Sequence, residues 1–193
     1  MSVSHDMNTE KRPYRMRARA AAAAETHRRI LAAMRELAIE RFLEEITLED
    51  VAERAGVATR TVIRRFGGRE RLVEATVAEA IDQVQARRDE TPVGDVEDAV
   101  EAVFDDYEAN GDALMMMLAQ ERRHPELLGP LADDGRRLHW QWIERVFTPR
   151  DRQQAAQLIA ATDVYVWKLL RRDIGLSRAR AKAAMAEMVA RLT

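Results

Sequence analysis

Five basic side chains and no acidic one occur between Arg54 and Arg69. Thr59 and Thr61 stand in the same stretch, which therefore combines cations with hydroxyl groups that can donate hydrogen bonds. A second run, residues 11–19, also holds five Lys or Arg residues and no acid. In a chain of net charge −2, two such segments indicate local contact with a polyanion. The competing interpretation is that both runs are solvated surface.

The spacing around Gly56 predicts two short crossed helices that would position the central basic stretch. Thr47 and Asp50 form a capping-box-like start for the first helix. Ala52 allows close approach of the two helices, Gly56 allows a left-handed backbone, and Val62 anchors the second helix in a core. The second helix then keeps its arginines outside. A helix of this kind suits the major groove of DNA, where Arg can pair with guanine.

Residues 26–72 resemble the DNA-binding domain of the tetracycline-repressor (TetR) family of bacterial regulators. The residues that carry the resemblance are Ile30-Leu31-Ala32-Ala33, Phe42, Ile46 to Val57, Thr61-Val62, Arg65-Phe66-Gly67 and Arg69 to Leu72. There are two departures from the family pattern. Ile63 stands where the family often has a tyrosine that touches a phosphate, and Ala58 stands where Ser or Thr often caps the second helix.

The resemblance implies a set of DNA-contacting residues: Thr47, Thr59, Arg60, Thr61, Arg64, Arg65 and Arg69. Arg60 is expected to read a base edge, whereas Arg64 and Arg65 are expected to position the protein on phosphates. Thr47 and Arg69 would lie near phosphates at helix starts. The basic N-terminal arm either lies along the minor groove or only adds charge.

Helical spacing of apolar residues throughout the chain predicts an all-α fold of about nine helices. We expect a flexible basic arm over residues 1–19, a three-helix helix-turn-helix DNA-binding domain over 20–68, and an effector-binding and dimerisation domain over 69–193. A long helix should run from Arg69 to Asp89. Asn110-Gly111, Gly129-Pro130 and residues 133–135 should divide the helices that follow.

The segment from Leu158 to Leu170 is apolar on nearly all sides, which predicts burial on two sides, one of them against a second copy. The last helix offers small residues for close crossing. Together they resemble the four-helix dimer interface of the family. The residues expected there are Leu158, Ile159, Thr162, Tyr165, Val166, Leu169, Ala183, Ala186 and Val189. The alternative is a core formed entirely within one chain.

Aromatic and methionine side chains are concentrated in the middle of the chain, where they could form the wall of an effector pocket. The candidate ligand-binding residues are Phe104, Tyr107, Met115, Met116, Trp140, Trp142 and Phe147. Because Met115, Met116 and Met117 are consecutive, they cannot share one helix face. The alternative is that most of these side chains simply fill the core.

Other function classes have no support in the sequence. With no Cys there is no thiolate site or disulfide, and the four His residues show no close metal-ligand pairing. No Gly-rich phosphate loop or zinc-protease motif occurs, so we expect neither an enzyme nor a cofactor or metal. No apolar run approaches the roughly 18 residues of a membrane span, and no leader is apparent. We expect a cytoplasmic protein without a membrane partner.

The resemblance implies a homodimeric transcriptional regulator, most often a repressor, that an unknown small-molecule effector releases from a palindromic operator on double-stranded DNA. The alternative is a helical small-molecule sensor or scaffold that acts through protein partners without DNA. Only the isoleucine at position 63 favours this alternative.

Overall fold

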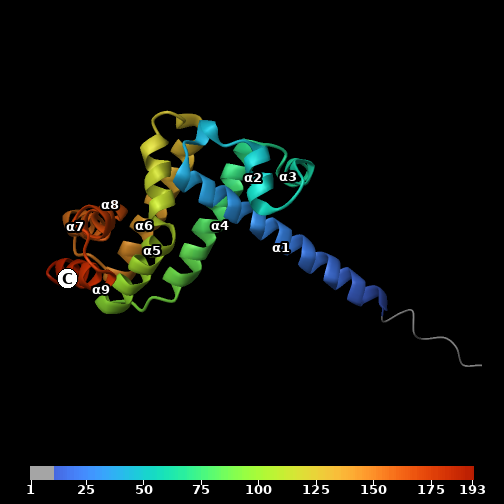
Figure 1. Cartoon of the computed structure of the whole chain (residues 1–193). Coiled ribbons are helices and arrows are strands. Elements are labelled where there is room, and N and C mark those ends of the chain that lie inside the picture. Colours follow the sequence, from blue (N-terminus) through green and yellow to red (C-terminus); the bar gives the residue numbers. More distant parts are fainter. Residues whose placement is uncertain (1–10) are drawn as a thin grey trace, which may run out of the picture.

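The computed structural model describes residues 11–193, with side chains from residue 16 onward, and this part of the chain is all-helical as expected (Figure 1). In chain order the helices are α1 (Lys11–Glu40), α2 (Leu48–Ala55), α3 (Thr59–Phe66), α4 (Arg69–Asp89), α5 (Val96–Gln120), α6 (Pro125–Phe147), α7 (Arg152–Ala161), α8 (Val164–Lys168) and α9 (Arg178–Ala190). A 3₁₀ turn, η1 (Leu43–Glu45), precedes α2, and a π-helical turn, η2 (Leu169–Asp173), follows α8.

The molecule has two hydrophobic cores. The first unites α1 to α4 around Ile30, Leu37, Val62 and Leu72, and Leu128 of α6 also joins it. The second core unites α5 to α9 and includes the largest buried residues of the C-terminal part. In Figure 1, α2 and α3 lie beside α1 at one end, α7 to α9 lie at the other, and α4 runs between them. Helix α4, which directly follows α3 in the chain, thus connects the two parts.

Helix α1 begins earlier than the sequence suggested. We expected residues 1–19 to form a flexible arm, but α1 continues back to Lys11, and residues 1–10 lie outside the described part. The reason is local, because residues 16–24 are Met, Arg and Ala, which all have high helix propensity. Arg17 and Arg19 are exposed on this extension.

Three expected helix breaks are wrong. Helix α5 passes through Asn110-Gly111 without interruption. A Cβ atom at Gly111 would lie 2.5 Å from Cζ3 of Trp167, so a larger residue does not fit at this position. This glycine therefore serves close helix packing rather than a turn. Helix α6 passes through Gly129-Pro130 and residues 133–135, and its buried residues, among them Leu128 and Ala132, compensate for the helix-breaking residues.

The apolar segment from 158 to 170 is not one helix. Helix α7 ends at Ala161, and the Asp163 side chain accepts a hydrogen bond from the Tyr165 N–H, at 2.8 Å, to cap α8. Because of this break, part of the segment packs inside the chain. Leu158, Thr162 and Val189, which we expected at an interface between copies, are buried within the chain at 0% exposure.

Candidate nucleic-acid interface and internal cavity

The turn between α2 and α3 has the geometry that its sequence predicts. The Thr47 hydroxyl accepts from the Asp50 N–H at 3.1 Å, and the Asp50 carboxylate accepts from the Thr47 N–H at 2.9 Å. The Thr47 hydroxyl also donates to the Asp50 carboxylate, at 2.6 Å, and this hydrogen bond together with the one from the Thr47 N–H holds the pKa of Asp50 below its usual value. Gly56 ends α2 in the left-handed region, with φ 63° and ψ 43°. The Arg29 guanidinium of α1 donates to the Ala55 and Gly56 carbonyls and fixes the turn on α1.

Helix α3 separates its apolar and basic residues onto opposite faces. Val62 and Phe66 are buried, at 0% and 7% exposure, and Phe66 stacks on the His27 ring of α1. On the outer face Arg60 and Arg64 are exposed, and neither forms a salt bridge with any residue that the structure describes. These two guanidinium groups are therefore available to a partner.

The other residues expected to contact DNA are arranged less simply. Thr47 is exposed, whereas Thr59, Thr61, Arg65 and Arg69 are half-buried. The Arg65 Nε is buried without a hydrogen-bond partner among residues 16–193. Arg69 donates to the Leu43 carbonyl at 3.3 Å and to the Glu44 carbonyl at 3.5 Å. Its guanidinium thus joins α4 to η1.

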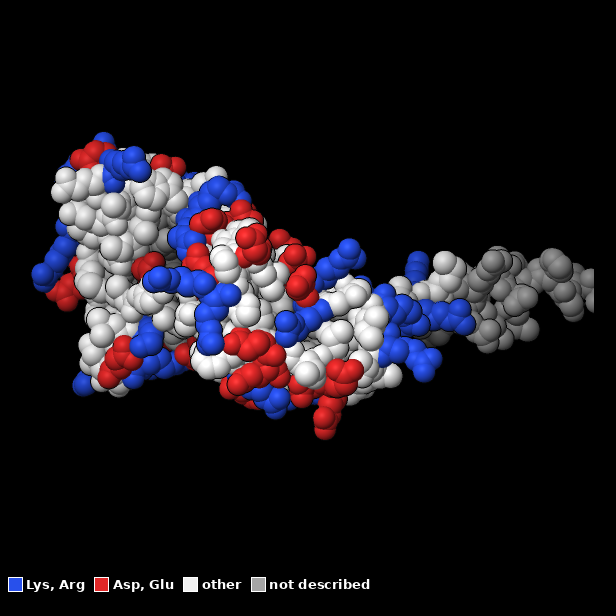
Figure 2. Space-filling view, turned by 90° about the horizontal axis from the view of Figure 1, so that it is seen from above, with Lys and Arg blue, Asp and Glu red and all other residues white. Residues whose placement is uncertain are grey.

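Arg54 does not contribute to the basic face, although it begins the basic stretch of the sequence. Its guanidinium binds Glu40 at 2.9 Å and Glu36 at 3.2 Å, which are both on α1. The hydrogen bond from Arg54 holds the pKa of Glu40 below its usual value. On the face shown in Figure 2, basic side chains predominate toward the N-terminal half of α1, and both signs mix over the rest.

A cluster of polar contacts joins η1 to the turn between α5 and α6. The Leu43 N–H donates to Oε1 of Gln120 at 2.7 Å, and Nε2 of Gln120 donates to the Met116 carbonyl at 3.0 Å. Glu44 Oε2 lies 2.9 Å from Nε2 of His124, and this contact lowers the pKa of Glu44. Because η1 directly precedes α2, these contacts connect the α2–α3 unit with the C-terminal part.

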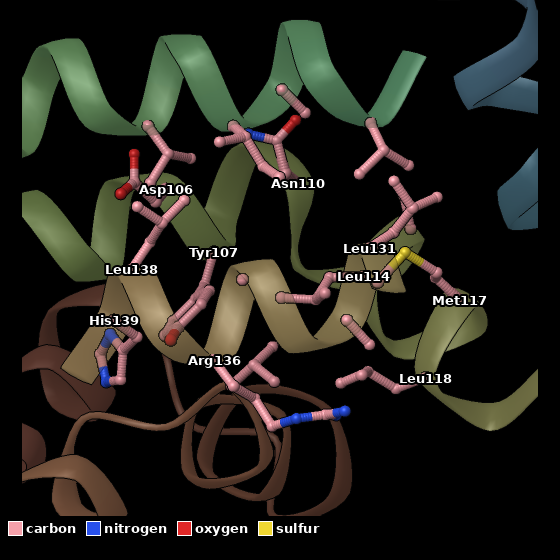
Figure 3. Close-up of a pocket in the computed structure, with 18 of the residues that line it drawn as sticks. Asp106, Tyr107, Asn110, Leu114, Met117, Leu118, Leu131, Arg136, Leu138 and His139 are labelled. Atoms are coloured by element: carbon pink, nitrogen blue, oxygen red, sulfur yellow. The ribbon is translucent and has the colours of Figure 1, made fainter. Parts of the chain in front are cut away.

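A cavity of about 720 Å³ lies between the two cores. Its wall includes Met34 of α1, Val73 and Val84 of α4, Leu114 of α5 and Leu131 of α6, and it also contains Leu43 and Gln120 from the contact at η1. Figure 3 shows apolar side chains from α5 and α6 around the space, with Asp106, Tyr107 and His139 gathered at one end. The volume is in the range of small-molecule sites.

The polar end of this cavity contains a buried network of paired charges. Asp106 is 2% exposed and accepts from Nε of Arg87 at 2.7 Å and from Nε of Arg88 at 2.8 Å. The Arg88 guanidinium also lies over the Trp142 ring, 5.0 Å from its centroid. Each charge in the network therefore has an opposite charge or a ring face beside it.

His139 is neutral in this network. The Arg88 Nη1 donates to Nδ1 of His139 at 2.9 Å, so the ring proton must be on Nε2, which lies 3.0 Å from the Thr162 hydroxyl. That hydroxyl donates to the Leu158 carbonyl at 2.8 Å. Burial lowers the pKa of His139 to about 3.

Tyr107 closes the same end of the cavity. Its hydroxyl donates to the Thr162 carbonyl at 3.0 Å, and burial raises its pKa to about 12. The phenol is thus neutral, like the ring of His139.

Three of the seven side chains expected at an effector pocket, Tyr107, Trp140 and Trp142, line the cavity. The other four do not: Phe104 and Phe147 are buried in the second core, Met115 packs against that core, and Met116 is not part of the wall. Sequence reasoning missed α4. The side chains that α4 contributes to the wall recur at helical spacing, and this spacing could have predicted that one face of α4 lines the cavity. They are Val73, Thr76, Val77, Ala80, Ile81, Val84 and Arg88.

The outer surface of α8, η2 and α9 carries large apolar side chains. Tyr165 is 55% exposed and Leu169 is 49% exposed, and Ile174 and Met188 are exposed as well. Of the other residues expected at an interface, Ala183 is exposed and Ile159, Val166 and Ala186 are half-buried. We call the exposed set Tyr165, Leu169, Ile174 and Met188 the apolar surface of α8–α9.

The part of the chain that the structure describes has neither a cluster of metal ligands nor a helix suited to a membrane. No group of His, Asp and Glu side chains in this part of the chain could hold a metal ion. None of its helices combines the length and the apolar character of a membrane span.

Residues 30–76 match the family model described as bacterial regulatory proteins, tetR family. The matched range covers the end of α1, the α2–α3 unit and the start of α4. It therefore coincides with the part of the chain that presents Arg60 and Arg64. No curated protein is significantly similar to this chain in sequence.

Solved structures share the fold over most of the chain. A candidate transcriptional regulator from Streptomyces coelicolor A3(2) is 26% identical with a TM-score of 0.63, covering 88% of this chain and 98% of its own. A transcriptional regulator from Rhodococcus sp. Rha1 is 19% identical with a TM-score of 0.69, covering 86% and 95%.

A third structure, a TerR/AcrR family transcriptional regulator from Aquifex aeolicus VF5, is 14% identical with a TM-score of 0.70 and covers 87% of this chain and 99% of its own. Each of these similarities covers 86–88% of this chain. Residues 30–76 thus form a domain of the tetR family of bacterial regulatory proteins, and the chain as a whole has the fold of TetR-family transcriptional regulators.

Proposed function

We propose that this protein is a homodimeric DNA-binding transcription regulator, a repressor that a small-molecule effector releases from a palindromic operator. The observation that carries the proposal is the outer face of α3. Arg60 and Arg64 are exposed and unpaired within the described chain, while Val62 and Phe66 hold the helix in the core. An anchored helix with free guanidinium groups can enter a major groove and donate to guanine or phosphate.

The roles of the individual residues follow from their exposure. Arg60, near the N-terminus of α3, is the base reader, and Arg64 contacts phosphate. Thr47, exposed at the start of α2, and the half-buried Thr59, Thr61 and Arg65 of α3 support the contact with the backbone of DNA. Arg69 contributes to phosphate binding only if its contact with η1 opens.

A dimer is needed because one short reading helix gives too little contact for selective binding. The apolar surface of α8–α9 supports this part of the proposal, since four large apolar side chains are exposed there. Two copies joined through this surface would present two α3 helices. The helices would meet half-sites spaced about 34–36 Å apart on a palindrome.

The cavity supports release by an effector because its wall belongs to both cores. Gln120 lines the cavity and also holds the N–H of Leu43, just before α2. A ligand that fits better when this contact rearranges would shift the two α3 helices out of register. Such coupling is typically about 1–3 kcal/mol between the two sites.

Selection from fragmented genomic DNA of the source organism tests the proposal. The purified full chain should enrich a small set of palindromic sequences, and binding to them should survive competitor DNA and weaken steeply with salt. The Arg60→Ala variant serves as the matched control. Enrichment of no sequence by the intact chain would contradict the proposal.

A helical sensor that acts through protein partners is the second candidate, and the exposed Ile63 favours it. This side chain is 48% exposed in the middle of the proposed DNA face, where an apolar residue gives no phosphate contact. The same selection separates the two candidates, because a sensor of this kind would bind DNA neither selectively nor with a steep salt dependence.

A further inference from the structure

The cavity distinguishes ligands by charge. We propose that it takes an uncharged, mainly apolar molecule with one hydrogen-bonding group, and that the side-chain amide of Asn110 pairs with that group. The inference rests on the proposed effector role of the cavity and adds the chemical class of the ligand. It depends on three features: the pairing of the wall's charges, their position, and the state of its neutral polar groups.

The buried ionisable groups of the wall are already satisfied. Asp106 has two guanidinium partners, and Arg88 has Asp106, His139 and the ring of Trp142. His139 and Tyr107 are neutral, and each already donates its proton to the Thr162 region. A ligand with a net charge would find no unpaired opposite charge among these buried groups, and beside them it would have to break a buried pair at a high cost.

The remaining charged residues of the wall are engaged elsewhere or face water. Arg136 is 53% exposed and binds Glu121 and Asp133, and Arg41 is 43% exposed and lies 3.4 Å from Asp50. Arg145 donates to the carbonyls of Arg88 and Thr91, beside Asp89. Asp163 caps α8, and Arg35 of α1 is partly exposed to solvent. Arg35 and Asp163 have no salt-bridge partner among the described residues, but neither is fully buried, so each keeps contact with water and neither offers a desolvated counter-charge to a ligand.

Asn110 differs from the groups above because its amide has no hydrogen-bond partner among the residues that the structure describes. The side chain extends from α5 toward α4 along the cavity wall, with Tyr107 and Leu114 on the same helix face (Figure 3). The neighbouring Gly111 packs directly on Trp167, so α5 cannot rotate to turn Asn110 away. A half-buried amide facing a cavity is matched by a hydroxyl or a carbonyl of a ligand.

Most of the wall around Asn110 is apolar. Val77, Ile81 and Val84 of α4 face Leu114 and Met117 of α5 and Leu138 of α6. The body of the ligand must therefore be hydrocarbon or aromatic, and only one position on it needs a polar atom. Gln85 and Gln141 are the other side-chain amides without a partner on this wall, but Gln85 lies next to Arg88, toward the polar end, and Gln141 is exposed.

Three naphthalenes of similar shape test the charge and the polar group separately. The competitors are 2-acetylnaphthalene, which is neutral with a carbonyl, 2-ethylnaphthalene, which has no polar atom, and 2-naphthoate, which is anionic. Their affinities are measured by displacement of the neutral fluorophore Prodan from the full chain. We expect the ketone to bind about 3- to 10-fold more tightly than the ethyl compound, as one net hydrogen bond implies. It should bind at least about tenfold more tightly than the carboxylate.

The Asn110→Leu variant locates the preference. It should retain the 2-ethylnaphthalene affinity and lose the preference for the ketone, since only the hydrogen bond is removed. Gln85→Leu is the matched control on the facing helix, and it should keep the preference. A preference that persists in Asn110→Leu, or that disappears in Gln85→Leu, would overturn the assignment to Asn110.

The failures of the two proposals are distinguishable. Equal or tighter binding of 2-naphthoate, or no displaceable binding of any of the neutral compounds, would overturn the proposed ligand class. Binding that follows the expected order without weakening the complex with operator DNA would leave the ligand class standing. It would instead contradict the effector role of the cavity.

Discussion

Two groups of arginines in this molecule have opposite environments. On α3, Arg60 and Arg64 are exposed and have no acidic partner in the described structure, whereas Arg87 and Arg88 converge on one buried carboxylate, that of Asp106. The surrounding helices decide this difference: they leave the arginines of α3 unpaired and bring Asp106 to Arg87 and Arg88. The sequence next to each arginine does not decide it. The free group is suited to bind an external polyanion, and the paired group stabilises the polar end of the cavity wall.

The largest expected effect comes from breaking the paired group. Asp106→Ala leaves Arg88 buried without its carboxylate, and we expect the free energy of unfolding to fall by about 3–5 kcal/mol. Urea denaturation at one fixed protein concentration measures it. Asp112→Ala is the control, because the Asp112 pair with Arg172 is partly exposed, with side chains 46% and 37% accessible. That change should cost about 1 kcal/mol or less.

Removing a free arginine should affect DNA binding and leave folding unchanged. Arg60→Ala should weaken binding to the selected operator by about 1–3 kcal/mol and relax the preference at one base position. Fluorescence anisotropy with operator variants measures both. Arg54→Ala is the matched control, since Arg54 is already bound to Glu36 and Glu40. An equal loss on operator and random DNA would argue against base reading by Arg60.

The neutral histidine of the cavity wall predicts a pH dependence of stability. Its pKa is about 3 in the folded chain, below the ordinary 6.5, so the unfolded chain takes up a proton first as the pH falls. The contribution of neutral His139 to the free energy of unfolding is thus complete above about pH 6.5 and decreases toward pH 3. Between about pH 7.5 and pH 5 the free energy of unfolding should fall by about 2 kcal/mol on this account. His139→Gln should show a correspondingly shallower pH profile.

The smallest expected effect concerns the residue that joins the two regions. Gln120→Leu removes the acceptor of the Leu43 N–H and leaves the apolar wall intact. We expect operator affinity within a few-fold of the unchanged chain, and a loss of about 1 kcal/mol of the coupling between ligand and DNA. Titration of operator DNA with and without a cavity ligand measures the coupling. Unchanged coupling would show that the signal travels by α4 alone.

The α2–α3 unit was predictable because its determinants are close together in sequence. The Thr47–Asp50 capping box, the left-handed Gly56 and the buried Val62 all depend on residues within one or two helical turns. The cavity wall was only partly predictable. Tyr107, Trp140 and Trp142 were recognised by residue type, but Phe104 and Phe147 share that type and lie in the core instead.

The sequence by itself determined the local pattern: helices with an apolar and a polar face, a glycine at the turn, and a basic outer side on α3. Only the tertiary structure decided which charges remain free. Arg54 and Arg69 belong to the same basic stretch as Arg60, yet they meet Glu40 of α1 and the carbonyls of η1. Such partners come from distant segments, and the pairing of a charge depends on packing that residue types alone do not specify.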